Sequence, residues 1–173
     1  QWFRYHQLFR DSLRTNLSPS LKKELHLKAA RWFSDQKLYE EAVQEALKAE
    51  EYKMAVANIV SAVPDYLEKG ELQVLLELME MIPDKYLNES EMLLIMKAWL
   101  LFVLGRKKDS QYYIDIIKRK LDFKDKTNRG RLLTLTALWA KSQGETEAFN
   151  QAETALNLLD EEDKIFKINA LMS

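Results

Sequence analysis

Residues that could carry out chemistry are few and scattered along this sequence. The only two histidines, His6 and His26, fall on different predicted helices, and the chain has no cysteine, so a zinc site and a thiolate nucleophile are both disfavoured. None of the four glycines stands in a G-x-x-x-x-G-K or a G-x-G-x-x-G arrangement, so no phosphate-binding loop is encoded. No Ser-His-Asp spacing is recoverable. We therefore expect no catalytic residue, no metal and no cofactor in this chain, and an enzyme is kept only as a residual hypothesis.

Charged residues offer one candidate binding segment. Residues 118–131 contain seven Lys and Arg residues against two aspartates, which is compatible with a contact to nucleic acid. A solvated loop between repeats, containing Asn128 and Gly130, is the favoured alternative. The acidic stretch 145–163 could balance this run across the surface. With 26 basic and 27 acidic residues in the whole chain, we expect no direct contact with DNA.

Aromatic side chains are expected mainly in the core. Trp32, Trp99 and Trp139 each fall on an apolar stripe, which favours packing over a ligand cage. Tyr112 directly precedes Tyr113, so one of the two must point away from the packed face of their helix. Tyr112 is therefore a candidate aromatic residue in a partner-binding groove.

The elements that hold these residues are predicted to be helices throughout. Glycine and proline are scarce, with 4 and 3 residues, whereas strand-rich folds need frequent turn residues. Leu, Ala, Glu and Lys dominate, and these residues favour helices. Ser18-Pro19 predicts the start of a helix, and Pro64 predicts a kink or an end. Asn88 with Glu91 has the pattern of a capping box that opens the most apolar helix of the chain.

Weak internal repeats suggest how the helices are arranged. Trp99 followed by Gly105 recurs loosely as Trp139 followed by Gly144, with the two Trp residues forty apart. The second copy also contains Ala148 and Ala155, which are seven positions apart. Small residues at this spacing let two helices approach closely. We therefore predict an all-α fold of antiparallel helix pairs, stacked as a tetratricopeptide-repeat-like (TPR-like) α-α superhelix.

The last predicted helix, beginning near Asp160, carries an apolar stripe that includes Ile168, with Phe166 beside it. No partner helix follows in this sequence. We expect the stripe to pack only partly on the preceding helix pair and the remainder to drive self-association. Phe166 and Ile168 are therefore candidate partner-binding residues.

A resemblance to a known family begins with the opening segment, which reads Gln1-Trp2-Phe3-Arg4-Tyr5-His6-Gln7-Leu8-Phe9-Arg10-Asp11. It is similar to the W-[YF]-R-[YF]-H-x-L-F segment that closes the winged-helix region of MalT-like, ATP-dependent LuxR-family transcriptional regulators. Further blocks similar to that family follow in order: Glu24-Leu25-His26, Ala29-Ala30-Arg31-Trp32-Phe33, Glu41-Ala42-Val43 with Ala46-Leu47, Leu67-Glu68-Lys69-Gly70-Glu71-Leu72, and Ile82-Pro83. The similarity covers residues 1 to about 106, and the remainder is similar only as a generic helical repeat.

This resemblance implies a bacterial, cytoplasmic, multidomain activator with a nucleotide-binding module, a winged helix, a TPR-like sensor array and a C-terminal helix-turn-helix. Residues 1–17 would be the end of the winged-helix or connector region, and residues 18–173 a TPR-like array that is incomplete at its C-terminal end. ATP or ADP would bind the parent protein outside this chain. The family also nominates His6 for contact with the nucleotide phosphates, although a partly buried His bonded to backbone is the favoured alternative. Gln7 stands where many relatives have a second His.

The leading hypothesis is a non-catalytic regulatory and sensor module of a MalT-like regulator, which couples effector or partner binding to the nucleotide switch and the DNA-binding domain. The expected partners are protein domains of the same chain and an effector small molecule or regulatory protein. The alternative is a free-standing TPR-like scaffold that binds peptides or proteins in its concave groove. Nothing calls for an oxidising compartment, so the cytoplasm is the default. The most apolar stretch, residues 92–104, is too short to span a bilayer, so we expect no membrane contact.

Overall fold

The computed structural model describes residues 17–120 and 125–173, and within these ranges all regular secondary structure is helical. The all-α prediction is confirmed. The helices are α2 (Pro19–Asp35), α3 (Tyr39–Lys48), α4 (Tyr52–Lys69), α5 (Leu72–Glu80), α6 (Asp84–Leu87), α7 (Glu91–Val103), α8 (Lys107–Lys120), α9 (Lys126–Gln143), α10 (Ala148–Leu158) and α11 (Lys164–Leu171). The candidate residue His6 and nearly all of the predicted connector at 1–17 lie outside the described residues.

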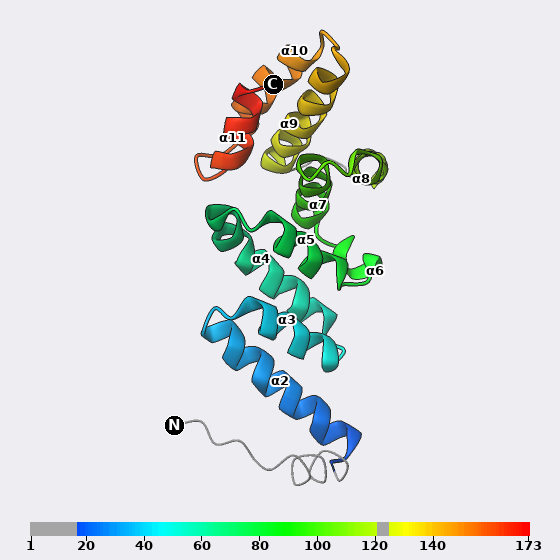
Figure 1. Cartoon of the computed structure of the whole chain (residues 1–173), viewed down its shortest axis with the longest axis vertical. Coiled ribbons are helices and arrows are strands. Elements are labelled where there is room, and N and C mark those ends of the chain that lie inside the picture. Colours follow the sequence, from blue (N-terminus) through cyan, green and yellow to red (C-terminus); the bar gives the residue numbers. More distant parts are fainter. Residues whose placement is uncertain (1–16, 121–124) are drawn as a thin grey trace.

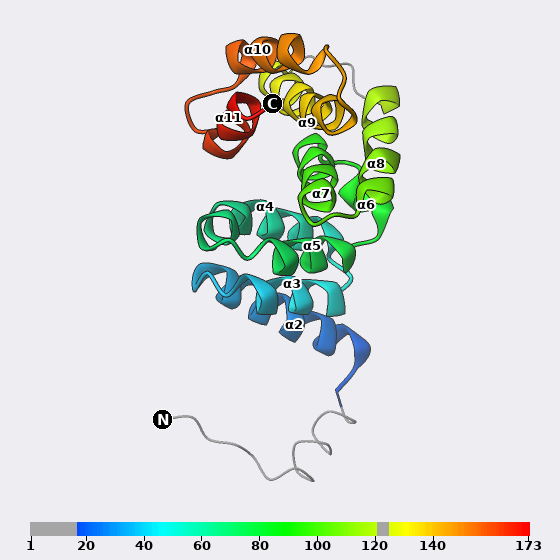
Figure 2. The ribbon, with the colours of Figure 1, turned by 45° about the horizontal axis from the view of Figure 1, so that its top comes forward.

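The helices pack in pairs, and the pairs stack along the long axis of the molecule (Figure 1). Helix α2 packs on α3, α4 on α5, α7 on α8 and α9 on α10, because short connections fold each helix back onto the one before it. Contacts between pairs run from α3 to α4, from α5 to α7 and from α7 to α9, while α11 packs on α9 and α10. Figure 2 shows α2 to α5 as successive layers, with α7 between them and α9.

Serine side chains cap the starts of α2 and α7, the first as predicted and the second not. Ser18 Oγ accepts a hydrogen bond from the N–H of Leu21 at 3.2 Å, and Pro19 stands in the first turn, where its missing N–H is not needed. The capping box predicted at Asn88 is wrong. Asn88 closes the short helix α6, because the chain makes this extra helical turn before it enters α7. Ser90 then caps α7 by accepting a backbone hydrogen bond at 3.4 Å.

The sequence predicted that Pro64 kinks or ends its helix, and the prediction of an end is wrong. Helix α4 continues to Lys69 and is closed by Gly70, whose φ of 72° lies in the left-handed region that favours glycine. Proline removes one N–H and disfavours the helix locally. Val63 and Tyr66 on either side of it are buried in the core, and this packing holds the helical path.

Helix α7 forms the centre of the core. All nine residues from Leu93 to Leu101 are buried, because α5, α8 and α9 surround this helix. Trp99 in this segment is 4% exposed, as predicted, but the same prediction is wrong for Trp32, which is 49% exposed on α2, the first described helix of the array. No described helix, α7 included, combines the length and the apolar composition needed to cross a bilayer.

The prediction of a solvated loop at residues 118–131 is wrong for most of that range, because α8 runs to Lys120 and α9 begins at Lys126. Asp125 caps α9 by accepting hydrogen bonds from the N–H groups of Thr127 (2.9 Å) and Asn128 (3.3 Å). Asn128 and Gly130 are buried in this helix. A Cβ on Gly130 would lie 3.1 Å from a side-chain atom of α10, so glycine lets these two helices approach closely.

Helix α11 begins at Lys164 and not near Asp160 as predicted, because α9 holds the preceding turn in place. Thr127 Oγ1 donates to Asp160 Oδ2 at 2.6 Å, and Arg131 pairs with Asp163 at 2.7 Å. Part of the acidic stretch 145–163 therefore does balance part of the basic run across the surface of the array.

Candidate functional site

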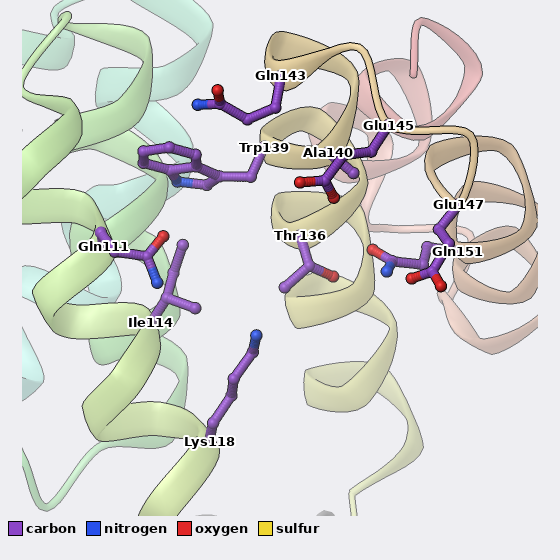
Figure 3. Close-up of a pocket in the computed structure, with 10 residues that line it drawn as sticks. All are labelled: Gln111, Ile114, Lys118, Thr136, Trp139, Ala140, Gln143, Glu145, Glu147 and Gln151. Atoms are coloured by element: carbon purple, nitrogen blue, oxygen red, sulfur yellow. The ribbon is translucent and has the colours of Figure 1, made fainter.

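A polar groove of about 380 Å³ lies over α9, between α8 and the start of α10 (Figure 3). Its lining combines amide, carboxylate, ammonium and hydroxyl groups with one aromatic and two aliphatic side chains. The lining residues are Gln111, Ile114, Lys118, Thr136, Trp139, Ala140, Gln143, Glu145, Glu147 and Gln151. This α8–α10 groove lies at the lower end of the size range of small-ligand pockets, and it is the candidate site.

Trp139 supplies the aromatic surface of the groove, and side chains of α7 and α8 hold its ring in place. Its Nε1 donates to Ser110 Oγ at 3.4 Å, and that hydroxyl donates to the carbonyl of Ala98 at 2.7 Å. Its ring centroid lies 5.6 Å from that of Phe102. Contacts to α7 and α8 thus fix the polar edge and one flank of the ring, and Figure 3 shows the indole reaching from α9 across the groove towards α8. The predicted core position is therefore only partly correct, since the side chain is half-buried.

Helix α8 forms the first wall. Gln111, Ile114 and Lys118 recur at helical spacing and therefore share one face of this helix. Ile114 is buried and anchors the wall in the core, whereas Lys118 is exposed and extends its ammonium group into the groove (Figure 3). Gln111 Nε2 donates to Asp115 Oδ1 at 2.9 Å, which fixes the amide along the helix surface.

The opposite wall comes from the turn into α10. Gly144 ends α9 with a φ of 75°, and the chain then carries Glu145 over α9 beside Ala140 and Glu147 to the start of α10 beside Gln151, across the groove from Lys118 (Figure 3). Both carboxylates are exposed, and within residues 17–120 and 125–173 neither forms an ion pair. One helical turn later, Gln151 places a buried Oε1 that has no hydrogen-bond partner in the described structure. This wall is therefore acidic and has unused acceptors.

The groove offers binding groups and no nucleophile paired with a base. Its lining includes no His, Cys or Ser, and the hydroxyl of Thr136 donates to the carbonyl of Leu133 at 3.0 Å. In the part of the chain that the structure describes, no group of three or more His, Cys, Asp or Glu side chains could hold a metal ion. Donors, acceptors and both signs of charge around an aromatic ring suit the recognition of a polar ligand.

A second cluster of titratable side chains lies where α6, α7 and α8 meet. Lys97 Nζ lies 3.5 Å from Asp84 Oδ1 and 4.6 Å from the ring centroid of Tyr113, whose hydroxyl donates to the same Oδ1 at 3.2 Å. Burial and the Asp84 carboxylate raise the pKa of Tyr113 above its usual value, so the hydroxyl keeps its proton. These groups are engaged with one another, and the cluster therefore joins three helices instead of presenting a free reactive group.

Two of the site residues predicted from the sequence are exposed, but they do not form one site. Tyr112 is 58% exposed on α8, its ring centroid lies 5.4 Å from that of Tyr113, and it does not line the groove. Ile168 is 54% exposed on α11. Figures 1 and 2 both show α8 and α11 on opposite sides of α9, so the two residues face different surroundings. The prediction for His6 concerns a residue outside the described ranges.

The expectation that Phe166 meets a partner at the surface is corrected. Its side chain is 3% exposed, and its ring centroid lies 6.0 Å from that of Trp99. Helix α11 turns the face that carries Phe166 and Ala170 towards α9, and it leaves Ile168 and Leu171 outside. Sequence spacing identified the apolar residues of this helix but not which of them face inward.

Sequence reasoning did not find the α8–α10 groove as a unit, because its residues come from three helices that meet only when the pairs stack. Two signals pointed towards it. Lys118 opens the basic run, and Glu145 opens the acidic stretch. What periodicity could not show is that these two charges lie on opposite walls of one groove.

Comparison with known proteins gives a partial match. No family model matches the chain, and no solved structure matches it. The chain is similar to the serine/threonine-protein kinase PknK of Mycobacterium tuberculosis and of Mycobacterium bovis, at 30% identity over 108 residues in each case. The match covers 61% of this chain and 10% of the kinase, so the chain spans about a tenth of the length of the curated relatives it matches.

Proposed function

We propose that this chain is a non-catalytic interaction and sensor module of a cytoplasmic, MalT-like transcriptional regulator. In this role a TPR-like array receives an effector or a partner protein and passes the change to a nucleotide switch and a DNA-binding domain outside the chain. ATP or ADP binds the parent protein outside this chain, and His6 is the residue of this chain that the resemblance nominates to contact its phosphates.

The position of the α8–α10 groove is the observation that carries this proposal. The groove is lined from α8, which belongs to one helix pair, and from α9 and α10, which form the next pair. A ligand bound there contacts both pairs at once and so favours one relative position of the two. Differential binding of this kind is what shifts a conformational equilibrium, and successive helix pairs can pass such a shift along an array.

Two further findings support the proposal. The helices are paired and stacked in sequence order, as in repeat arrays. The 108 matched residues are 10% of the curated relatives, as expected for one module of a much longer multidomain protein. The kinase activity in the name of those relatives is not carried over, because this sequence contains neither the H-R-D nor the D-F-G signature of protein kinases.

The gene on either side of these residues provides the first test. We expect it to encode a phosphate-binding loop upstream and a helix-turn-helix downstream. A gene that encodes neither would overturn the proposal and favour the free-standing scaffold.

The second test uses the whole gene product in a reporter strain. Glu147→Lys reverses a charge in the groove without touching the core, so ATP binding and DNA binding should remain while induced transcription is lost. Glu153→Lys is the matched control, because Glu153 is exposed on α10 outside the groove lining. Full induction by the Glu147→Lys protein would contradict the proposal.

A further inference from the structure

We propose that the α8–α10 groove binds an arginine-bearing peptide segment, with the guanidinium group between Glu145 and Trp139 and its flat face over the indole, and with Glu147 adding negative charge to the same wall. This inference rests on the proposed function and deepens it, because it names the chemistry of the partner that the groove receives. The occupant is a segment of a separate partner protein that presents an exposed arginine side chain.

Charge favours a cation in this groove. Between Glu145 and Asp163 the chain carries seven carboxylates and no Lys or Arg, and the groove lining itself holds two carboxylates against the single ammonium of Lys118. Glu147 precedes α10 but makes no capping hydrogen bond to its backbone, so its carboxylate is not used by the helix. An arriving cation therefore finds acceptors that are charged and exposed but not engaged with a described partner.

The aromatic surface favours a flat cation. Trp139 already donates its Nε1 proton to Ser110, so it offers the groove a ring face and no free donor. A guanidinium group stacks on such a face while its edge donates to carboxylates, and it presents five N–H groups in a fixed plane. An ammonium group has no flat face to lay on the ring, so an indole and carboxylates in one groove favour arginine over lysine.

The binding test compares capped tripeptides that differ in a single side chain. Ala-Arg-Ala is titrated into the chain by calorimetry and by amide NMR, beside the citrulline peptide, which keeps the shape of arginine without its charge, and the glutamate peptide. We expect the arginine peptide to bind about tenfold more tightly than the citrulline peptide and to shift the signals of residues 145–151 and of the Trp139 indole. Equal binding of arginine and citrulline peptides, or tighter binding of the glutamate peptide, would overturn the proposal.

Three variants test the residues themselves, and all change exposed side chains that the fold does not need. Glu145→Gln combined with Glu147→Gln should weaken the arginine peptide about tenfold and leave the citrulline peptide unchanged. Lys118→Gln should tighten the arginine peptide about threefold, a gain that loss of structure cannot produce. Glu153→Gln is the control and should bind as the unmodified chain does. Unaltered affinity in the double variant would sink the idea.

The proposed function and the proposed ligand fail in different ways. If the arginine peptide binds as expected but Glu147→Lys leaves induced transcription intact, the proposed function fails and the ligand chemistry of the groove stands. If Glu147→Lys abolishes induction but no arginine peptide binds, the groove is functional and the inference about its ligand is wrong.

Discussion

Arg131 binds Asp163 through two nitrogen atoms, with Nε at 2.8 Å and Nη2 at 2.7 Å from the same carboxylate oxygen. The side chains are 20% and 9% exposed, so the pair is largely shielded from water. The guanidinium carbon also lies 6.0 Å from the ring centroid of Phe166. Arg131 stands on α9 and Asp163 immediately precedes α11, so this pair ties the last helix to the array.

Breaking this pair should cost stability at the junction of α9 and α11. We expect Asp163→Asn and Arg131→Met each to lower the free energy of unfolding by about 1–3 kcal/mol, because Asn removes the charge opposite the shielded guanidinium and Met leaves the shielded carboxylate without its partner. A double-mutant cycle from urea unfolding should give a clear coupling energy between the two sites. The exposed pair Glu24–Lys28 is the comparison, and its coupling should be close to zero. Equal coupling in both cycles would contradict the role assigned to Arg131.

The buried lysine in α7 leads to an asymmetric prediction. Lys97 is 5% exposed, whereas the side chain of its partner Asp84 is 59% exposed. Asp84→Asn should destabilise by about 2 kcal/mol, because it leaves a buried ammonium without a carboxylate. Lys97→Met should change the free energy of unfolding by less than about 1 kcal/mol, because the remaining carboxylate is already in water. Urea denaturation measures both, and a larger loss for Lys97→Met would contradict this asymmetry.

Helix α10 allows a direct test of register. Ala148 is 5% exposed against α9, while its neighbour Glu147 is exposed. Ala148→Leu should therefore destabilise by about 1–3 kcal/mol through overpacking, and Glu147→Leu should leave the melting temperature nearly unchanged. The same melting temperature for both variants would mean that the packed face of this helix has been assigned wrongly.

Glu45 should make the free energy of unfolding depend on pH under acidic conditions. Burial alone would raise the pKa of this carboxyl, but hydrogen bonds from Lys48 (2.6 Å) and His26 (2.5 Å), with their charges, outweigh burial and lower it below 4.5. A carboxyl with a lowered pKa in the folded state contributes stability above its unfolded pKa, and this contribution is lost as the pH falls through the folded pKa. Glu45→Gln should cost about 1–2 kcal/mol at neutral pH.

The difference between the unmodified chain and Glu45→Gln should shrink as the pH falls below 4.5, the ordinary value for this carboxyl. Glu68→Gln, on an exposed side chain of α4, should show no such trend. Thermal melts over an acidic pH series give the result, and a difference that stays constant down to the acid limit would exclude the proposed contribution of Glu45.

The fold class was predictable from the sequence because it depends on composition and on local signals. Ser18 and Pro19 mark a helix start that needs no tertiary contact to form. Local signals failed where two of them competed. Asn88 and Ser90 are both good capping residues two positions apart, and only the short helix α6 before them decides which one caps α7.

The candidate site was less predictable, because a sequence shows which residues share one helix face but not which faces meet. Trp32 and Trp99 lie on similar apolar stripes, yet one is exposed and the other is buried, since α5, α8 and α9 pack around α7 whereas Trp32 lies on the first described helix. Lys118 and Glu147 are far apart in the chain and lie on opposite walls of the groove only because of how the helix pairs stack.

The complete burial of the middle of α7 determines how the chain can open. Solvent deuterons reach the amides of residues 93–101 only when the neighbouring helices separate from this one, because no part of that stretch is at the surface. Local fraying at α2 therefore leaves α7 protected, and its amides exchange only through the rarest, most global openings. Since α5 contacts it from one half of the array and α9 from the other, we expect both halves to share these openings and to unfold together.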